Sequence, residues 1–201
     1  MNKYESSLVC IEGLDRSGKT TLFNKLKEEL PENEWVFTQE PSDRKYGQVA
    51  GEFLSDNDEP SPADFYLFLA DRYDHCENVI KPALEEGKNV LCDRYHMSTY
   101  AYQSRVLDEQ LDVIDPFDYI EEMTGHFVIE PDLTLYVDIS VDESISRMED
   151  EVEKYENRDR LEEAKRVYNW MIREQDNVEI LSGAVKPESI LKGSLFFINE
   201  I

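Results

Sequence analysis

Short apolar runs alternate along the chain with longer segments in which apolar residues recur every three or four positions. The runs at 8–11, 34–38, 89–93, 133–138 and 178–181 have the length and composition of buried strands. The periodic segments between them are typical of amphipathic helices. Strands that alternate with helices pair in parallel and are covered by helices on both faces. We therefore predict a three-layer α/β/α fold with a five-stranded parallel sheet, which binds ligands at the carboxyl ends of its strands.

Capping residues mark several helix ends. Ser61 and Pro62 open a long helix that is expected to run to about residue 86, where Gly87 ends it. Pro82 is expected to break or kink the last turn of that helix, because it lacks a backbone N–H. Other helices are expected at 21–30, 98–109, 116–123, 161–175 and from 187 onward, a capping box opens another at 140–143, and the segment at 39–47 is expected to be a turn.

Length and composition favour a single domain over residues 1–201. No apolar run approaches the roughly 18 residues that cross a membrane, and the first residues lack an apolar signal segment. The three cysteines, Cys10, Cys76 and Cys92, form no C-x-x-C pair. They are expected to be reduced thiols, with Cys10 and Cys92 in core strands. We therefore expect a cytoplasmic protein.

The chain is strongly acidic, with 45 Asp and Glu against 21 Lys and Arg and a formal net charge of −24. A nucleic-acid-binding protein requires the opposite balance, so the charge disfavours that class. The excess acid is most simply a solvated surface that keeps the protein soluble, and adaptation to a salty cytoplasm is the alternative. An anionic ligand must then meet basic residues that are concentrated at one site.

A glycine-rich motif follows the first predicted strand. Residues 13–20 have the sequence GLDRSGKT, the G-x-x-x-x-G-K-T pattern of a phosphate-binding loop, and a predicted helix follows at once. Gly13 and Gly18 allow backbone N–H groups to turn toward one anion, and the helix N-terminus adds partial positive charge. Lys19 can reach the outer phosphates, and the Thr20 hydroxyl can ligate Mg²⁺. The order strand, loop, helix therefore predicts a P-loop nucleotide-binding fold.

Three segments resemble the thymidylate kinase family of nucleoside monophosphate kinases. They are the phosphate loop at 12–21, the sequence DRYHMSTYAYQ at 93–103 and the sequence PDLTLYVD at 131–138. The resemblance extends over nearly the whole chain. It implies a P-loop kinase that transfers the γ-phosphoryl group of ATP to thymidine monophosphate (dTMP) for dTTP synthesis, with Mg²⁺ as cofactor and a homodimer as the usual assembly.

The implied reaction needs no general base, because the acceptor phosphate oxygen is already ionised at neutral pH. The site must instead position two anions and neutralise the growing charge. The resemblance assigns catalysis to Asp15, Arg16, Lys19 and Arg94, and Arg16 resembles the arginine of members that carry an arginine finger in the phosphate loop. It assigns ATP binding to Gly13, Leu14, Asp15, Arg16, Ser17, Gly18, Lys19, Thr20, Thr21, Arg147 and Ala184, and metal binding to Thr20 and Asp93.

The acceptor is expected to contact several separate segments. Phe68 and Arg72 lie four residues apart on the long helix and so share a face. The resemblance implies that Phe68 stacks on the thymine and that Arg72 hydrogen-bonds its carbonyl. It further implies that Arg94 clamps the acceptor phosphate, that Asp15 accepts the 3′-hydroxyl and that Tyr102 lies where a ribose 2′-hydroxyl would be. The alternatives are core packing for the aromatic residue and helix capping for the hydroxyl residues. Pro41, Ser98, Thr99 and Tyr155 complete the implied set.

The charged stretch at 142–160 resembles the lid of the family. The resemblance places Arg147 on the donor adenine and Tyr155 over the acceptor. It also places the segment 182–185, which contains Ala184, beside the donor base. The alternative is a helix that solvent surrounds, because a segment with this many charged residues is usually a solvent-exposed helix face.

Two positions depart from the family pattern. Gln39 and Lys154 stand where arginine is common, and neither supplies a planar guanidinium. We expect that Arg44 replaces the charge missing at Gln39 or that the acceptor phosphate is held less tightly. The resemblance also suggests a cis peptide bond between Glu40 and Pro41.

Other functions are compatible with parts of the sequence. A kinase of the same fold could act on another nucleoside monophosphate or on a nucleoside. A GTP-binding switch needs an N-K-x-D motif, which the sequence lacks, and a nucleotide-binding protein without activity does not need the full set of basic residues. His75, His96 and His126 lack the spacing of a metal site, and no function is assigned to them.

Overall fold

The computed structural model describes residues 4–54, 59–148, 155 and 157–201. Its centre is a five-stranded sheet in the order β2-β3-β1-β4-β5, in which neighbouring strands are parallel. The predicted fold class is therefore confirmed. The strands are β1 (Leu8–Glu12), β2 (Trp35–Gln39), β3 (Asn89–Asp93), β4 (Leu133–Asp138) and β5 (Val178–Ser182).

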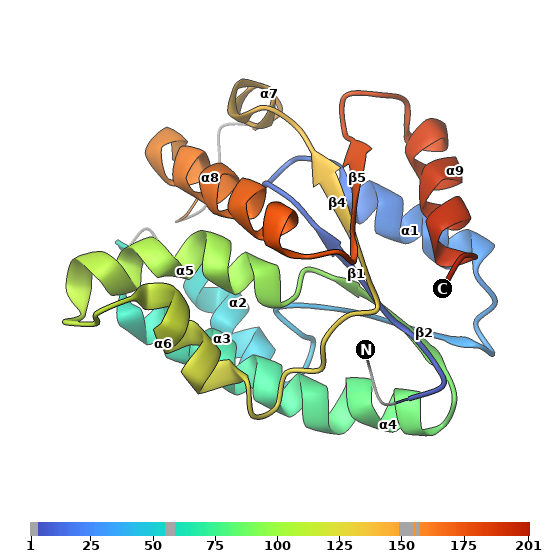
Figure 1. Ribbon diagram of the computed structural model, residues 1–201, viewed down its shortest axis with the longest axis horizontal. Coiled ribbons are helices and arrows are strands. Elements are labelled where there is room, and N and C mark those ends of the chain that lie inside the picture. The colour runs from blue at the N-terminus through green and yellow to red at the C-terminus, as the bar shows by residue number, and fades with distance from the viewer. Residues whose placement is uncertain (1–3, 55–58, 149–154, 156) are drawn as a thin grey trace.

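Helices cover both faces of the sheet (Figure 1). One face carries α1 (Lys19–Glu29) and α9 (Pro187–Ile198), and the short α7 (Val141–Ser146) follows β4. The helices on the other side are α2 (Lys45–Leu54), α3 (Pro62–His75), the π-helical turn η1 (Cys76–Ile80), α4 (Lys81–Glu85), α5 (His96–Gln110), α6 (Pro116–Thr124) and α8 (Arg158–Glu174).

The side chains of β1 alternate between the two helical layers. Val9 and Ile11 pack against α1 and α9, whereas Leu8 and Cys10 face the helices on the other side. The whole strand is buried, as expected for a central strand of a parallel sheet. By the same alternation its last residue, Glu12, lies on the face of Leu8 and Cys10.

Among the described residues, α2 is a helix that the sequence pattern does not predict. α2 begins at Lys45, inside the segment at 39–47 for which the sequence predicts a turn. Gly47 and Gly51 lower its intrinsic helix propensity. A Cβ at Gly47 would lie 2.1 Å from the carbonyl oxygen of Ser42, so this glycine marks a close contact between the helix and the preceding loop and not a break in the chain.

The long helix predicted from Ser61 to about residue 86 is present but contains a wide turn. Ser61 caps α3 in a capping box with Asp64, and Gly87, with φ of +75°, follows the end of α4. The chain forms η1 just before Pro82, because proline supplies no N–H and its ring excludes the carbonyl group one turn earlier. The predicted break is therefore a π-helical turn. The other predicted helices have ends within about one turn of the observed ones.

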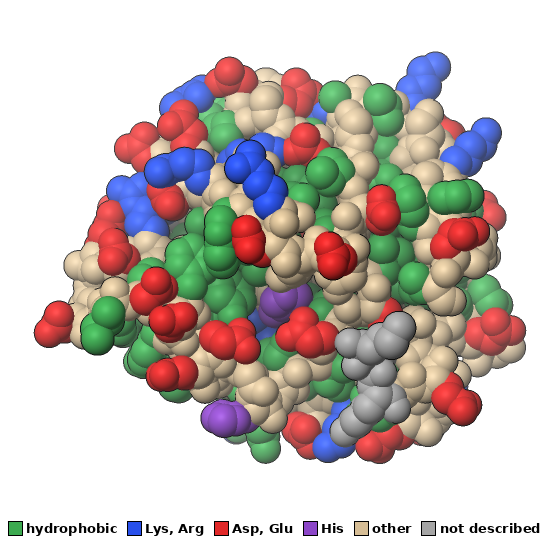
Figure 2. Space-filling model, in the orientation of Figure 1, with side chains coloured by type: hydrophobic (Ala, Val, Ile, Leu, Met, Phe, Trp, Pro, Cys, Tyr) green, Lys and Arg blue, Asp and Glu red, His purple; other side chains and the backbone are tan. Residues whose placement is uncertain are grey.

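Acidic side chains are spread over the face that Figure 2 shows, among apolar and uncharged groups. The described part of the chain contains no helix with the length and apolarity needed to cross a bilayer. Cys10, Cys76 and Cys92 are buried free thiols, and Cys10 and Cys92 lie in β1 and β3 as predicted.

Candidate active site

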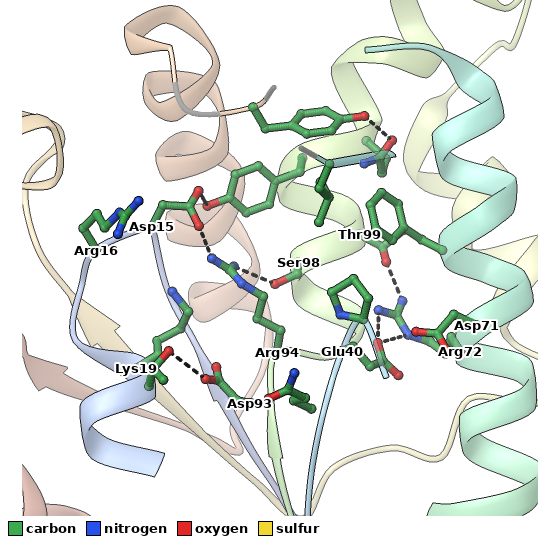
Figure 3. Close-up of a pocket in the computed structure, with 18 residues that line it drawn as sticks. Asp15, Arg16, Lys19, Glu40, Asp71, Arg72, Asp93, Arg94, Ser98 and Thr99 are labelled. Atoms are coloured by element: carbon green, nitrogen blue, oxygen red, sulfur yellow. Dashed lines mark hydrogen bonds and ion pairs between the residues drawn. The ribbon is translucent and has the colours of Figure 1, made fainter. Parts of the chain in front are cut away.

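The carboxyl ends of β1, β2 and β3 border a cavity of about 410 Å³ (Figure 3). A cavity of this size accommodates a small-molecule ligand. Its walls come from the loops after these strands and from α3 and α5, at the edge of the sheet where the topology predicts a ligand. The predicted site residues that line it are Asp15, Arg16, Lys19, Thr20, Pro41, Phe68, Arg72, Asp93, Arg94, Ser98, Thr99, Tyr102 and Tyr155.

The loop between β1 and α1 has the backbone geometry that anion binding requires. Gly13 and Gly18 have φ values of +146° and +104°, in the region that residues with side chains rarely adopt. Gly18 is also the N-cap of α1, so the positive end of that helix faces the loop. The predicted donor residues that do not line the cavity are Gly13, Leu14, Ser17, Gly18, Thr21, Arg147 and Ala184.

Side chains from α7 and the residue after it hold the backbone of this loop. Ser144 Oγ donates to the carbonyl oxygen of Asp15 at 2.7 Å. Arg147 donates to the carbonyl oxygens of Arg16 at 3.1 Å and of Gly183 at 3.0 Å. Neither side chain lines the cavity. Arg147 thus contacts the loop backbone in this structure, and its place on the donor adenine stays a prediction.

Lys19, Thr20 and Asp93 form one corner of the cavity. Lys19 Nζ donates to the carbonyl oxygen of Leu14 at 2.6 Å, and burial together with the nearby Arg94 lowers the pKa of Lys19 to about 8. Thr20 Oγ1 donates to Asp93 Oδ2 at 3.2 Å. Asp93 Oδ1 is buried and has no hydrogen-bond partner among the described residues. An unpartnered carboxylate oxygen beside a hydroxyl suits a hard cation such as Mg²⁺, so these residues fit the predicted metal site.

Arg94 and Asp15 form an ion pair in the cavity wall. Arg94 has φ of +64°, a strained value for a residue with a side chain, and it donates to Ser98 Oγ at 3.2 Å. Tyr102 donates to the second oxygen of Asp15 at 2.8 Å. Burial alone raises the pKa of Asp15, but Arg94, Lys19 and the Tyr102 hydrogen bond hold it below its ordinary value. Asp15 is therefore an ionised acceptor at neutral pH.

A buried carboxylate, to which the sequence patterns assign no role, supports this wall. Glu12 is 0% exposed and accepts hydrogen bonds from Tyr95 N at 2.9 Å, Ser98 N at 3.1 Å, Ser98 Oγ at 2.6 Å and Tyr168 Oη at 3.0 Å. Burial raises its pKa. Through Ser98 it holds both the start of α5 and Arg94 in place. The signal in the sequence is an acidic residue at the end of an otherwise apolar strand.

Replacing Glu12 with alanine is expected to lower the free energy of unfolding by roughly 3 kcal/mol or more, because several buried donors lose their shared acceptor. Unfolding in urea measures this loss. The control Tyr168→Phe removes one donor only and is expected to cost about 1 kcal/mol. Equal losses in the two variants would show that the shared acceptor is not what stabilises this region.

Phe68 and Arg72 of α3 line the cavity, and Figure 3 shows Arg72 across the cavity from Lys19. Phe68 is half-buried and lines the cavity, so it is not a core residue. Arg72 is buried, and its guanidinium donates to Glu40, to Thr99 and to the carbonyl oxygen of Tyr95. The lining residues that were absent from the predicted set are Gln39, Glu40, Leu54, Asp71 and Gln103.

The loop after β2 agrees with the prediction in part. Its Glu40–Pro41 peptide bond is cis, as predicted. Asp71 fastens the loop to α3 by accepting a hydrogen bond from Ser42 N at 2.8 Å. Arg44 pairs with Asp74 and does not line the cavity. Arg44 therefore contacts a carboxylate outside the cavity in this structure. Whether it replaces the missing charge or the acceptor phosphate is held less tightly stays a prediction.

The structure describes part of the predicted lid at 142–160. Tyr155 lies in the cavity wall, where its hydroxyl donates to Asp64 Oδ2 at 2.9 Å and lies 3.3 Å from Gln103 Oε1. Its ring centroid lies 6.2 Å from that of Tyr102. Lys154 lies outside the described residues, so the effect of lysine at this position stays a prediction.

Comparison with known proteins identifies the family. The model of the family described as thymidylate kinase matches residues 11–192. The chain belongs to the thymidylate kinase family. A probable thymidylate kinase from Natronomonas pharaonis is 37% identical over 165 residues, which are 82% of this chain and 83% of the relative. One from Halorubrum lacusprofundi is 33% identical over 186 residues, which are 92% of this chain and 93% of the relative.

Solved structures agree with the thymidylate kinase fold. The structure of thymidylate kinase from Candida albicans is similar to this chain with a TM-score of 0.80 at 22% identity, over 97% of this chain and 92% of that chain. This similarity confirms the predicted fold, and the family model and the relatives confirm the family and the enzyme class that three sequence motifs predict. Membership of the thymidylate kinase family excludes a GTP-binding switch.

Proposed function

We propose that this chain transfers the γ-phosphoryl group of ATP to dTMP and releases ADP and the diphosphate. One observation carries the proposal: a single cavity joins the phosphate loop to a wall that suits a flat base, and Arg94 lies between them. Figure 3 shows Lys19, Arg94 and Arg72 around this one space. Two nucleotides bound there would meet through their phosphates, which is the arrangement that phosphoryl transfer needs.

On the donor side, the N–H groups of the loop and Lys19 bind the phosphates of ATP. Thr20 and Asp93 hold Mg²⁺, which supplies positive charge to the phosphate oxygens. Arg16 lines the cavity from within the loop, and its guanidinium stabilises the negative charge on the transferred group. In this proposal the chain is a loop-arginine member of the family. Arg147 and Ala184 border the donor base.

On the acceptor side, Arg94 binds the phosphate of dTMP, and Asp15 accepts a hydrogen bond from the 3′-hydroxyl of dTMP. Phe68 stacks on the thymine, and Arg72 donates to its carbonyl oxygen. Tyr102, whose hydroxyl is bound to Asp15 at 2.8 Å, fills the space of a ribose 2′-hydroxyl and so favours a deoxy sugar. Pro41, Ser98, Thr99 and Tyr155 complete the acceptor site.

We also propose the organisation of the active protein. The chain acts as one catalytic domain whose lid, at about 142–160, closes over the acceptor through Tyr155. Two copies form a homodimer, as the family suggests. Light scattering on the purified protein tests the dimer by its mass.

A panel of nucleoside monophosphates tests the proposed acceptor in a coupled assay of ADP release with Mg²⁺-ATP. dTMP is expected to give the highest kcat/KM, with dUMP second, because the cavity combines a stacking ring with a hydrogen-bond donor. Faster turnover of AMP or CMP would show that the cavity binds another base. Binding of dTMP without ADP release would instead indicate a nucleotide-binding protein that lacks activity.

A further inference from the structure

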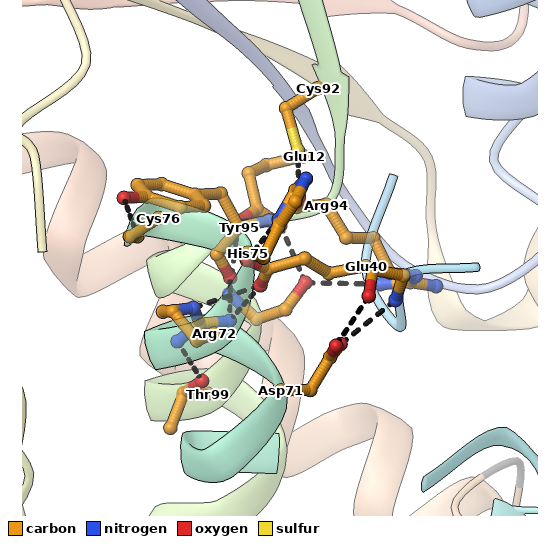
Figure 4. A network of polar contacts seen from close by, with 12 residues as sticks. Glu12, Glu40, Asp71, Arg72, His75, Cys76, Cys92, Arg94, Tyr95 and Thr99 are labelled. Atoms are coloured by element: carbon orange, nitrogen blue, oxygen red, sulfur yellow. Dashed lines mark hydrogen bonds and ion pairs between the residues drawn. The ribbon is translucent and has the colours of Figure 1, made fainter. Parts of the chain in front are cut away.

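A network of polar side chains joins Arg72 and Glu40, which line the cavity, to His75, which does not (Figure 4). It runs from Thr38 on β2 through His75 on α3 and Glu40 after β2 to Arg72 and Thr99. His75 is 0% exposed and does not line the cavity. One ring nitrogen of His75 contacts Thr38 and the other contacts Glu40. The histidine therefore links the sheet to the carboxylate that binds Arg72.

The guanidinium of Arg72 is almost fully engaged by the protein. Its Nε donates to Glu40 Oε2 at 2.8 Å, Nη2 donates to the same oxygen and to the carbonyl oxygen of Tyr95 at 3.0 Å, and Nη1 donates to Thr99 Oγ1. A guanidinium has five N–H hydrogens, so one hydrogen on Nη1 has no partner among the described residues. The plane of the guanidinium determines where that hydrogen points, and Glu40 determines the plane.

Glu40 can act in this way because it is ionised and is bound at both oxygens. Burial favours the neutral acid, but Arg72 and then His75 hold the pKa of Glu40 below its ordinary value. A carboxylate only accepts hydrogen bonds, so His75 Nδ1, which lies 3.0 Å from Glu40 Oε1, carries the hydrogen between them. His75 Nε2 lies 2.6 Å from Thr38 Oγ1, and this second contact sets the rotation of the ring.

We propose that His75 is a positioning residue for base recognition: it orients the Glu40 carboxylate so that Arg72 presents its remaining hydrogen to a pyrimidine carbonyl group. The inference rests on the proposed function, because Arg72 has this task only if the cavity binds such a base. Simple core packing is the alternative role for His75. The contacts disfavour that alternative, because an apolar side chain here would remove the partner of a buried carboxylate oxygen.

Two substitutions at position 75 separate the two contacts. The amide nitrogen of asparagine takes the place of Nδ1, so His75→Asn keeps the hydrogen bond to Glu40 and loses the contact with Thr38. The longer glutamine reaches the place of Nε2, so His75→Gln keeps the contact with Thr38 and loses the bond to Glu40. Both variants lose the ring, so they serve as matched controls for packing.

His75→Gln is expected to raise KM for dTMP about tenfold, because a misdirected Arg72 weakens binding of the base in the ground state and the transition state alike. Its kcat and its KM for ATP are expected to stay within about twofold of the wild type. His75→Asn is expected to keep KM for dTMP within about threefold of the wild type. Steady-state kinetics and calorimetric titration with dTMP measure these values, and urea unfolding compares the stability of the two variants.

A third variant, Thr38→Val, removes the contact between Thr38 and His75 Nε2 at a partly exposed position. It is expected to raise KM for dTMP by about two- to fourfold, because the ring of His75 loses one of its two restraints. Equal KM values for the asparagine and glutamine variants, a rise in KM for ATP as large as that for dTMP, or no change in Thr38→Val would each overturn the inference. A wild-type protein that does not phosphorylate dTMP would overturn the proposed function instead.

Discussion

Replacing Arg16 with glycine is expected to lower kcat about 10³-fold while the affinity for ATP changes far less. Arg16 lines the cavity from within the phosphate loop, where a guanidinium stabilises charge that develops only as the phosphoryl group moves. Its φ is +59°, a value that glycine adopts freely. Glycine therefore removes the side chain without straining the loop. Steady-state kinetics with Mg²⁺-ATP and dTMP, together with titration of ATP, measures both quantities.

The matched control is Arg16→Lys, which keeps the positive charge but loses the planar guanidinium with its several N–H donors. Its kcat is expected to lie between those of the glycine variant and the wild type. A glycine variant with the kcat of the wild type would contradict the prediction and move the role to another arginine. Arg158 and Arg160 lie beside acidic side chains, and Arg147 contacts the loop itself. Arg147 would then be the next residue to replace.

The features that the sequence predicts correctly are those set by local physics. The five parallel strands follow from short apolar runs that alternate with helices, and the phosphate loop follows from Gly13, Gly18 and Lys19 between a strand and a helix. The sequence pattern does not predict α2, because the role of Gly47 depends on the residues that pack against it in the folded protein. It sits where a Cβ would collide with Ser42, and a glycine that is required by packing cannot be told from one that ends a helix.

The buried carboxylates are missed for a different reason. In a chain with 45 Asp and Glu, an individual acidic residue is most simply assigned to the solvated surface. Glu12 and Glu40 are distinguished only by partners that come from distant segments, such as Tyr168 and Arg72. Their role depends on tertiary contacts, and the same contacts decide that Arg72 is held by the protein while Arg44 pairs outside the cavity.

Replacing Arg94 with lysine is expected to lower kcat/KM for dTMP by about 10²- to 10³-fold, mainly through KM. Arg94 lies in the cavity wall with its guanidinium paired with Asp15. Although burial opposes its charge, Asp15 raises the pKa of Arg94, so the guanidinium stays protonated. The planar guanidinium of Arg94 has several N–H donors and can bind Asp15 and an acceptor phosphate at once, whereas the ammonium group of lysine is a single point of charge. The expected loss therefore falls on the acceptor, and KM for ATP should change little.

The same substitution at Arg44 is the matched control for Arg94→Lys. Arg44 also pairs with a carboxylate, Asp74, but it does not line the cavity. Arg44→Lys is therefore expected to leave kcat and both KM values within about twofold of the wild type. If Arg94→Lys raised KM for ATP as much as KM for dTMP, Arg94 would belong to the donor site. If Arg44→Lys weakened dTMP binding, the charge missing at Gln39 would be supplied by Arg44 after all, through a movement of the loop that joins β2 to α2.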